Sequence, residues 1–373
     1  MRVEDFIHIV GADFYTGVPD SQLKELCDYL HGRYGSDARH HVIAANEGNA
    51  VGTAAGYYLA TGRYPVVYMQ NSGEGNAINP LASLLNEKVY AISCIFIIGW
   101  RGEPGVHDEP QHVFQGEITL KLLELMGVEY TIISPGTREE EVEDAMKKYQ
   151  SLLAFGHSVA FVIRKGALSY EEEVRYTNEN SMSREDAIKR IAHAAAGDPV
   201  VCTTGKASRE LFEIRKAEGQ SHEKDFLTVG SMGHASSIAL GIALNTNRKV
   251  WCIDGDGALL MHMGAMATIG SCHPENMIHI VINNEAHESV GGMPTATCHM
   301  DINALAVSCG YPLVCKTSTE EQLEEALSEA RQGKVLRLIE VKCSIGSRTD
   351  LGRPTITPIK NKEDFIMYLG GKR

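Results

Sequence analysis

Short runs of apolar and β-branched residues recur along the chain, and longer segments with apolar residues at three- and four-residue intervals lie between them. The helical spacing is clearest at 139–150 and 320–332. The predicted strands are 65–70, 92–100, 129–134, 159–164, 199–204, 249–254, 278–283 and 336–342. Strands that alternate with helices at this pace predict parallel sheets covered by helices, which is an α/β fold.

One segment interrupts the alternation. Residues 168–183 are polar, charged and poor in aliphatic side chains, which is typical of a surface linker. Ser183 is then predicted to be the N-cap of a helix whose apolar stripe begins at Ala187 and Ile188. The 373-residue chain is therefore expected to form two doubly wound parallel-sheet domains, 1–167 and 184–373, joined by the linker 168–183.

Composition and charge narrow the possible partners. Hydrophobic residues make up 43% of the chain and charged residues 22%, as in folded globular proteins. The formal charge is 35 − 48 = −13, which argues against nucleic acid or an anionic membrane surface as a general partner. No apolar run is long enough to span a membrane. The nine cysteines include no C-x-x-C pair, which favours reduced thiols in a cytoplasmic protein.

The most specific chemical pattern lies in the second half of the chain. The predicted strand 249–254 ends in Gly255-Asp256-Gly257, and the next strand ends in Asn283-Asn284. We expect both motifs at the carboxyl ends of neighbouring parallel strands, where open α/β sheets bind ligands. A carboxylate and an amide oxygen suit Mg²⁺, and the glycines let the backbone approach a diphosphate. An isolated acid in a strand-to-helix turn is the alternative for Gly-Asp-Gly alone.

Two other phosphate-binding patterns are incomplete. The segment 203–208 contains Gly205-Lys206 but has Val200 where a Walker loop needs glycine. The segment 72–76 follows a strand but does not complete G-x-G-x-x-G. A nicotinamide-type Rossmann site is therefore poorly supported.

In the first half, Glu47 precedes a helical segment that is rich in small residues from Ala50 to Gly56. A glutamate here can simply favour the positive end of a helix dipole, which is worth a few tenths of a kcal/mol to about 1 kcal/mol. The small residues also allow another group to approach this helix closely. The sequence leaves both interpretations open at this point.

Taken together, Glu47 and the Gly-Asp-Gly and Asn-Asn motifs resemble the thiamine diphosphate (ThDP) enzyme family. The resemblance implies that Asp256 and Asn284 bind Mg²⁺ through their side chains and Ala286 through its carbonyl oxygen. It implies that Glu47 contacts the pyrimidine ring of the cofactor across a subunit interface. The site then requires a homo-oligomer, at least a dimer, with active sites at subunit interfaces.

The resemblance also assigns the two halves of the chain. The first becomes the pyrimidine-binding domain and the second the pyrophosphate-binding domain, and the linker leaves no room for the middle domain of many relatives. In the second domain, Gly230 and Met232 match the segment that bends the cofactor. The remaining cofactor-binding positions implied by the family are Gly205, Gly255, Gly257 and Ala258.

Several loops are similar to those of a subgroup that acts on phosphonopyruvate: 17–21, 71–76, 99–104, 108–112, 283–292, 346–348 and 351–354. This implies a carboxy-lyase that converts 3-phosphonopyruvate to phosphonoacetaldehyde and CO₂, a step in phosphonate biosynthesis. Glu47 would share a proton with the pyrimidine ring, and a raised pKa would serve that role. Sulfopyruvate or another small 2-keto acid is the alternative substrate. A non-catalytic regulatory protein on a nucleotide-like fold is a remote alternative.

An anionic keto acid needs a local cationic pocket in a protein of this charge. Arg101, Arg348 and Arg353 lie in glycine-rich loops and are candidates, although each could be a solvated surface charge. His112 and His287 are candidates for proton transfer, and His112 could instead be structural. The remaining substrate candidates are Asp20, Ser21 and Ser289, of which Asp20 could simply cap a helix.

Overall fold

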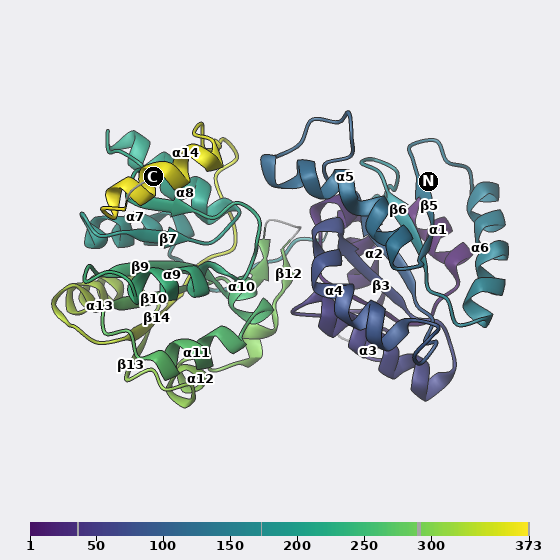
Figure 1. Ribbon diagram of the computed structural model, residues 1–373, viewed down its shortest axis with the longest axis horizontal. Helices are drawn as coiled ribbons and strands as arrows, with labels where there is room; N and C mark the ends of the chain where they lie inside the picture. Colours follow the sequence, from purple (N-terminus) through teal and green to yellow (C-terminus); the bar gives the residue numbers. More distant parts are fainter. Residues whose placement is uncertain (36, 173, 289–291, 372–373) are drawn as a thin grey trace. The chain divides into compact units, whose positions relative to one another are not determined.

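The computed structural model describes residues 1–373 except 36, 173, 289–291 and 372–373. The chain divides into two compact units, Met1–Arg175 and Tyr176–Arg373, drawn in purple to teal and in teal to yellow in Figure 1. The boundary between the units falls inside the segment 168–183. No helix in the described part of the chain has the length and apolar character needed to cross a membrane.

The first unit is built on a six-stranded sheet with the order β2-β1-β3-β4-β6-β5. Every neighbouring pair is parallel. The carboxyl ends of all six strands therefore lie along one edge of the sheet. The strands are β1 (Tyr15–Gly17), β2 (His41–Ile43), β3 (Val66–Gln70), β4 (Ile95–Gly99), β5 (Glu129–Ile133) and β6 (Val159–Ile163).

Helices cover both faces of this sheet. Phe161 of β6 packs against Phe6 and Tyr149 on one face, whereas its neighbours Ala160 and Val162 face the other helices. The first face carries α1 (Val3–Val10), α2 (Lys24–Tyr34) and α6 (Glu139–Ala154). The second carries α3 (Glu47–Thr61), α4 (Glu74–Pro80) and α5 (Pro110–Leu125), with the short helices η1 (Ser21–Leu23), η2 (Asn71–Gly73) and η3 (Leu81–Leu85) in the connections.

The second unit repeats the architecture with the strand order β13-β14-β10-β9-β7-β8, again fully parallel. A separate antiparallel pair joins β11 (Ala286–His287) to β12 (Met293–Pro294). The sheet strands are β7 (Val200–Cys202), β8 (Asp225–Leu227), β9 (Val250–Gly255), β10 (Met277–Asn283), β13 (Leu313–Thr317) and β14 (Arg337–Lys342).

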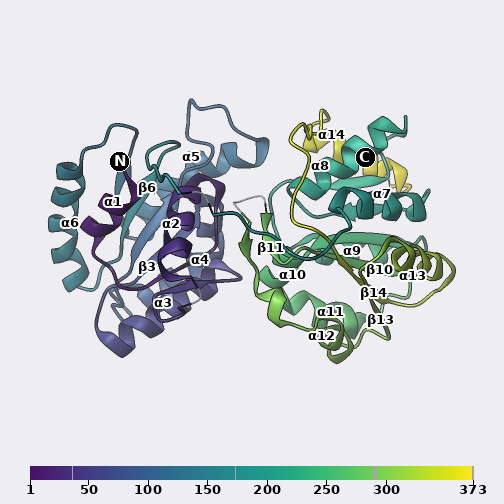
Figure 2. The same cartoon turned by 180° about the vertical axis from the view of Figure 1, so that it is seen from behind.

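Alternation along the strands divides the second core into two layers, which Figure 2 shows from behind. Trp251 and Ile253 of β9 face α7 (Arg184–Ala195), α8 (Lys206–Ala217) and α13 (Glu320–Gln332). Val250 and Cys252 face α9 (Ala235–Ala243), α11 (Gly264–Cys272) and α12 (Ile302–Ser308). The other elements are α10 (Asp256–Met261), η5 (Ala296–His299) and α14 (Pro358–Tyr368).

The fold class and the eight predicted strands are confirmed. Ser183 is the N-cap of α7, and its hydroxyl accepts a hydrogen bond from the backbone N–H of Asp186. The sequence pattern missed β1, β2, β8, β11 and β12, each of two or three residues, because so short a strand seldom shows a period. It also missed β13, in which only Thr317 is buried.

The segment 168–183 is more than a solvated connection. Asn178 and Asn180 both donate side-chain hydrogen bonds to the carbonyl oxygen of Cys343, at 2.9 and 3.1 Å. Asn178 also donates to the carbonyl oxygen of Asn284, at 2.9 Å. The polar composition that suggests a linker therefore includes side chains that hold the carboxyl ends of β10 and β14.

All nine cysteines of the chain are free, so none of them forms a disulfide.

Candidate active site

Four adjacent strands of the second unit carry the predicted cofactor residues at their carboxyl ends. The four strands lie side by side in the order β10, β9, β7 and β8. The chain continues from them into Asn284, Asp256, Gly205 and Gly230, respectively. Ile282 and Gly255 are register partners in the parallel pair of β10 and β9. The parallel sheet therefore brings together motifs that are up to 79 positions apart in the sequence, from Gly205 to Asn284 (284 − 205).

Asp256 is the first residue of α10, and its side chain is buried. One carboxylate oxygen, Oδ2, accepts hydrogen bonds from the hydroxyls of Thr295, at 2.6 Å, and Thr297, at 2.9 Å. Burial raises the pKa of Asp256 to about 6, and these hydrogen bonds offset part of the effect. A nearby cation would favour the ionised form further.

Asn284 is buried and fixed through both atoms of its amide. Its Oδ1 accepts a hydrogen bond from the N–H of Ala286, at 3.1 Å, and its Nδ2 donates to Glu288, at 3.0 Å. Glu288 is held in turn by Arg184, at 2.7 Å, and Lys206, at 2.9 Å. Burial alone would raise the pKa of Glu288, but the two cations outweigh it and the pKa is lowered. The amide oxygen of Asn284 keeps a second lone pair for a cation.

Ala286, the predicted backbone ligand of the metal ion, lies directly after a sharp turn that follows Asn284. Glu285 has a φ of 60°, so the chain turns sharply between Asn284 and Ala286. The register partner of Ala286 in β12 is Pro294, which has no N–H to donate. With Asp256 and Asn284, the carbonyl oxygen of Ala286 completes a set of hard oxygen donors, and such a set fits Mg²⁺.

The diphosphate side of the site is lined by glycine backbone. Gly257 lies in the first turn of α10, and a Cβ placed on it would be 3.4 Å from the ring of His287 and 3.5 Å from Cε of Met232. These three residues therefore converge at the helix N-terminus, next to the buried Ala258. Gly230 has a φ of 68°, and its N–H donates to Thr204 at 3.1 Å, so the turns after β8 and β7 are connected. The residues present fit a diphosphate with its metal ion.

The first unit places Glu47 at the start of α3, where Asn46 caps the helix by accepting a hydrogen bond from the N–H of Gly48, at 2.7 Å. Glu47 is 5% exposed, and its Oε2 accepts a hydrogen bond from Asn76, at 2.7 Å. Burial raises its pKa, and the hydrogen bond from Asn76 offsets part of that rise. A Cβ on Gly73 would lie 2.5 Å from Oε1 of Glu47, so only glycine fits there.

A second acidic side chain, Glu74, is buried one residue after Gly73. Both of its carboxylate oxygens are buried without a hydrogen-bond partner among the described residues. Burial raises its pKa to about 8. The burial of Glu74 could not be predicted from the sequence, because a glutamate at a helix start is usually solvated.

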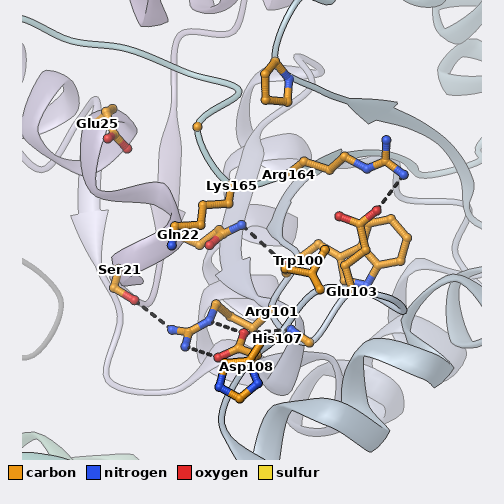
Figure 3. Close-up of a pocket in the computed structure, with 14 residues that line it drawn as sticks. Ser21, Gln22, Glu25, Trp100, Arg101, Glu103, His107, Asp108, Arg164 and Lys165 are labelled. Carbon is orange, nitrogen blue, oxygen red and sulfur yellow. Dashed lines mark hydrogen bonds and ion pairs between the residues drawn. The ribbon is translucent and has the colours of Figure 1, made fainter.

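A cavity of about 670 Å³ opens beside the ends of β1, β4, β5 and β6 (Figure 3). Its walls include Ser21 and Arg101, two of the predicted substrate residues. Arg101 forms a two-pronged ion pair with Asp108, at 2.6 and 2.8 Å, and donates to the hydroxyl of Ser21 at 3.1 Å. Asp20 caps η1 by accepting from the N–H of Gln22, and burial raises its pKa to about 6.

Lys165 lines the same cavity and was not predicted. Arg164, its neighbour in the chain, pairs with Glu103 at 2.6 Å, as Arg101 does with Asp108. Lys165 is exposed and has no ion pair or hydrogen bond with any described residue. Glu25 also lines the cavity, so the lining carries charges of both signs, and Lys165 is a cation there without an acidic partner among the described residues.

Other predicted residues lie in less suitable surroundings. His112 and His287 are buried, and burial lowers the pKa of each to about 4, so both rings are neutral at pH 7. Arg348 contacts three carboxylates, those of Glu185, Glu213 and Asp350, which leaves little positive field for a substrate. Arg353 is exposed in the same C-terminal segment. Ser289 lies outside the described residues.

The sequence reasoning missed the residues that hold the predicted ones in place. Thr295, Thr297, Asn76 and Asn178 each bond to a predicted site residue, but none forms a spacing pattern with it. The only sequence signal was that Asn76 lies in a loop similar to that of a known subgroup.

Comparison with known proteins agrees with this geometry. Residues 3–123 match the profile of the N-terminal TPP binding domain of thiamine pyrophosphate enzymes, and residues 202–341 match that of the C-terminal TPP binding domain. Thiamine pyrophosphate is another name for ThDP. The chain belongs to the thiamine pyrophosphate enzyme family, which confirms the resemblance and its cofactor.

Individual relatives cover nearly the whole chain. A phosphonopyruvate decarboxylase of Streptomyces viridochromogenes is 35% identical over 96% of this chain and 92% of its own. That of Streptomyces hygroscopicus is 34% identical over 94% and 88%. A sulfopyruvate decarboxylase of Methanosarcina acetivorans is 29% identical over 91% and 90%. No extra domain between the two units is needed to match them.

The burial of Glu74 predicts a pH-dependent stability. Between its ordinary pKa of 4.5 and about 8, the folded state keeps a proton that the unfolded state has lost. The free energy of unfolding should therefore fall as pH rises through this window, by up to about 1.4 kcal/mol per pH unit. Glu74→Gln should remove this slope in urea unfolding at pH 5.5 and 8. Glu139→Gln, at an exposed carboxyl, should keep the slope; an unchanged slope in Glu74→Gln would contradict the assignment.

Proposed function

We propose that this protein is a ThDP- and Mg²⁺-dependent carboxy-lyase that converts 3-phosphonopyruvate to phosphonoacetaldehyde and CO₂. The observation that carries the substrate is the match to two phosphonopyruvate decarboxylases along almost the whole chain. The site geometry supports the reaction class, because buried acids and hard oxygen donors of the kind that the cofactor and its metal ion need follow the carboxyl ends of the strands.

Asp256, Asn284 and the carbonyl oxygen of Ala286 hold the metal ion. The threonine hydroxyls on Asp256 fix the direction in which its carboxylate faces, and Glu288 fixes the amide of Asn284. The N-terminus of α10, with Gly255 and Gly257, would bind the diphosphate through backbone N–H groups. When bound, ThDP supplies the group that takes up the electron pair released as CO₂ leaves.

Glu47 holds a proton at its carboxyl group and shares it with the pyrimidine ring. Its burial disfavours the charged form, so the proton is retained closer to neutral pH than on an exposed glutamate. Asn76 and the missing side chain at Gly73 keep the carboxyl group in one orientation. The carbonyl carbon of the substrate gains one proton for each CO₂ released. His287, whose ring lies beside Gly257 at the N-terminus of α10, is the candidate that supplies this proton.

The cavity of the first unit binds the phosphonate end of the substrate in this proposal. Lys165 supplies the unpaired positive charge, while Ser21 and Arg101 supply hydrogen-bond donors, and Asp108 holds the guanidinium group of Arg101 in place. A phosphonate carries between one and two negative charges near pH 7, so it gains more from an added cation than a monoanionic sulfonate does.

Sulfopyruvate is the second candidate substrate, favoured by the relative from Methanosarcina acetivorans. We also propose that active sites form between subunits of a homo-oligomer, with Glu47 of one subunit and Asp256 and Asn284 of another. This arrangement is supported by the placement of the two sets of residues on separate units.

The function is tested by measuring CO₂ and aldehyde release from fresh 3-phosphonopyruvate with and without ThDP and Mg²⁺. We expect release only when both are present, and a kcat/KM at least about tenfold higher than with sulfopyruvate, a difference of about 1.4 kcal/mol. Cofactor-independent release would contradict the reaction class. A preference for sulfopyruvate would transfer the proposal to the second candidate.

Glu47→Gln tests the proton-holding role. We expect the variant to fold, as judged by circular dichroism, and to lose about 100-fold or more in kcat, because the amide cannot exchange the proton. Glu74→Gln is the matched control, since it removes another buried carboxyl of the same unit. Full activity in Glu47→Gln would refute the role.

Lys165→Met tests the phosphonate subsite. We expect KM for phosphonopyruvate to rise about tenfold or more, since hydrogen bonds to charged groups contribute about 1.5–3 kcal/mol. Lys165→Arg should recover part of the loss, and Lys121→Met on α5 should leave KM unchanged. An unchanged KM in Lys165→Met would remove the residue from the substrate site.

A further inference from the structure

A chain of buried hydrogen bonds runs through the second unit directly behind the Gly-Asp-Gly turn. The hydroxyl of Tyr311 lies 3.0 Å from Nδ1 of His279, and Nε2 of His279 lies 3.4 Å from Oδ2 of Asp254. The other oxygen of Asp254, Oδ1, accepts the N–H of Gly255 at 2.9 Å. Asp254 and His279 are 0% exposed and Tyr311 is 2% exposed.

The three side chains come from separate elements on one face of the sheet. Asp254 belongs to β9 and His279 to β10, while Tyr311 follows α12. Cys252, two residues before Asp254, faces the core layer formed with α9, α11 and α12, and Tyr311 belongs to that layer. Three polar groups therefore lie in an apolar layer, where a polar group without a hydrogen-bond partner is destabilising.

The chain of hydrogen bonds ends on the backbone that presents the metal ligand. Gly255 is the N-cap of α10, and Asp256 is its first residue. Ladder hydrogen bonds fix β9 only as far as Gly255, which pairs with Ile282. At this end of the strand, the hydrogen bond from the N–H of Gly255 to Asp254 helps to set the direction in which the chain continues into α10. His279 links Asp254 to β10, the strand that ends in Asn283.

We propose that Tyr311, His279 and Asp254 are positioning residues that hold the Gly255–Gly257 turn in the orientation needed to bind Mg²⁺ and the diphosphate. The inference rests on the proposed role of Asp256 as a metal ligand. The chain does not touch substrate or cofactor; it acts through the backbone of Gly255. Loss of one link should therefore weaken cofactor binding without changing the chemical step once the cofactor is bound.

Tyr311→Phe removes one hydroxyl from the chain, and Tyr149→Phe is its matched control. Tyr149 is also fully buried, and its hydroxyl bonds to Thr131 and to the carbonyl oxygen of Ala160 in the other unit. ThDP affinity is measured by isothermal titration calorimetry at saturating Mg²⁺. We expect a loss of about fivefold or more in Tyr311→Phe and less than about twofold in Tyr149→Phe, with kcat at saturating ThDP unchanged in both.

A second pair of variants separates the hydrogen bonds from the charge of Asp254. Asp254→Asn keeps an acceptor for the Gly255 N–H and an amide that can bond to His279, whereas Asp254→Ala keeps neither. We expect Asp254→Asn to bind ThDP within about threefold of the parent and Asp254→Ala to lose about tenfold or more. Equal losses in the two variants would overturn the proposal, because charge would then be the cause.

Two further outcomes are decisive. Wild-type affinity in Tyr311→Phe overturns the positioning role, whereas failure of the parent protein to bind ThDP refutes the proposed function itself. The ligand atoms of Cys252, Asp254 and His279 lie within 4.8 Å of one another. One equivalent of zinc in the purified protein would also overturn the proposal, since Asp254 and His279 would then be metal ligands.

Discussion

Burial of polar groups is the constraint on which both halves of the proposed site depend. Taking a carboxyl group out of water without a partner is unfavourable, so each buried acid needs surrounding donors or a proton. Two threonine hydroxyls meet this need for Asp256, Asn76 meets it for Glu47, and Arg184 with Lys206 meets it for Glu288. The same donors set the orientation of the acids, so stability and site geometry share one network.

Parallel sheet topology explains why residues distant in sequence can share this network. Every strand of a parallel sheet ends at the same edge, and the turns that follow are free of ladder hydrogen bonds. In the second unit, that edge collects the turns after β7, β8, β9 and β10. In the first, it collects Glu47 and the walls of the cavity. One fold, used twice, thus carries the residues of both halves of the proposed site.

The sequence was informative where periodicity or motif spacing was strong. Long strands such as β10, the cap at Ser183 and the placement of Asp256 and Asn284 after neighbouring strands all follow from local pattern. Partners such as Thr295 and Tyr311 could not be predicted, because they meet their targets only after the chain has folded back across 39 and 32 positions. The pairing of Arg101 with Asp108 could not be predicted either, because it depends on the conformation of the loop between them.

The division of the chain between Arg175 and Tyr176 separates two complete sheets, each with its own apolar layers, and cuts no strand. Neither half therefore needs a strand from the other half to complete its sheet. A gene for such a protein can be broken at this point into two reading frames, or assembled by fusing two, without either product leaving an unpaired sheet edge where the other was removed. Evolution can thus move between one-chain and two-chain versions of this architecture by changes to the linker alone.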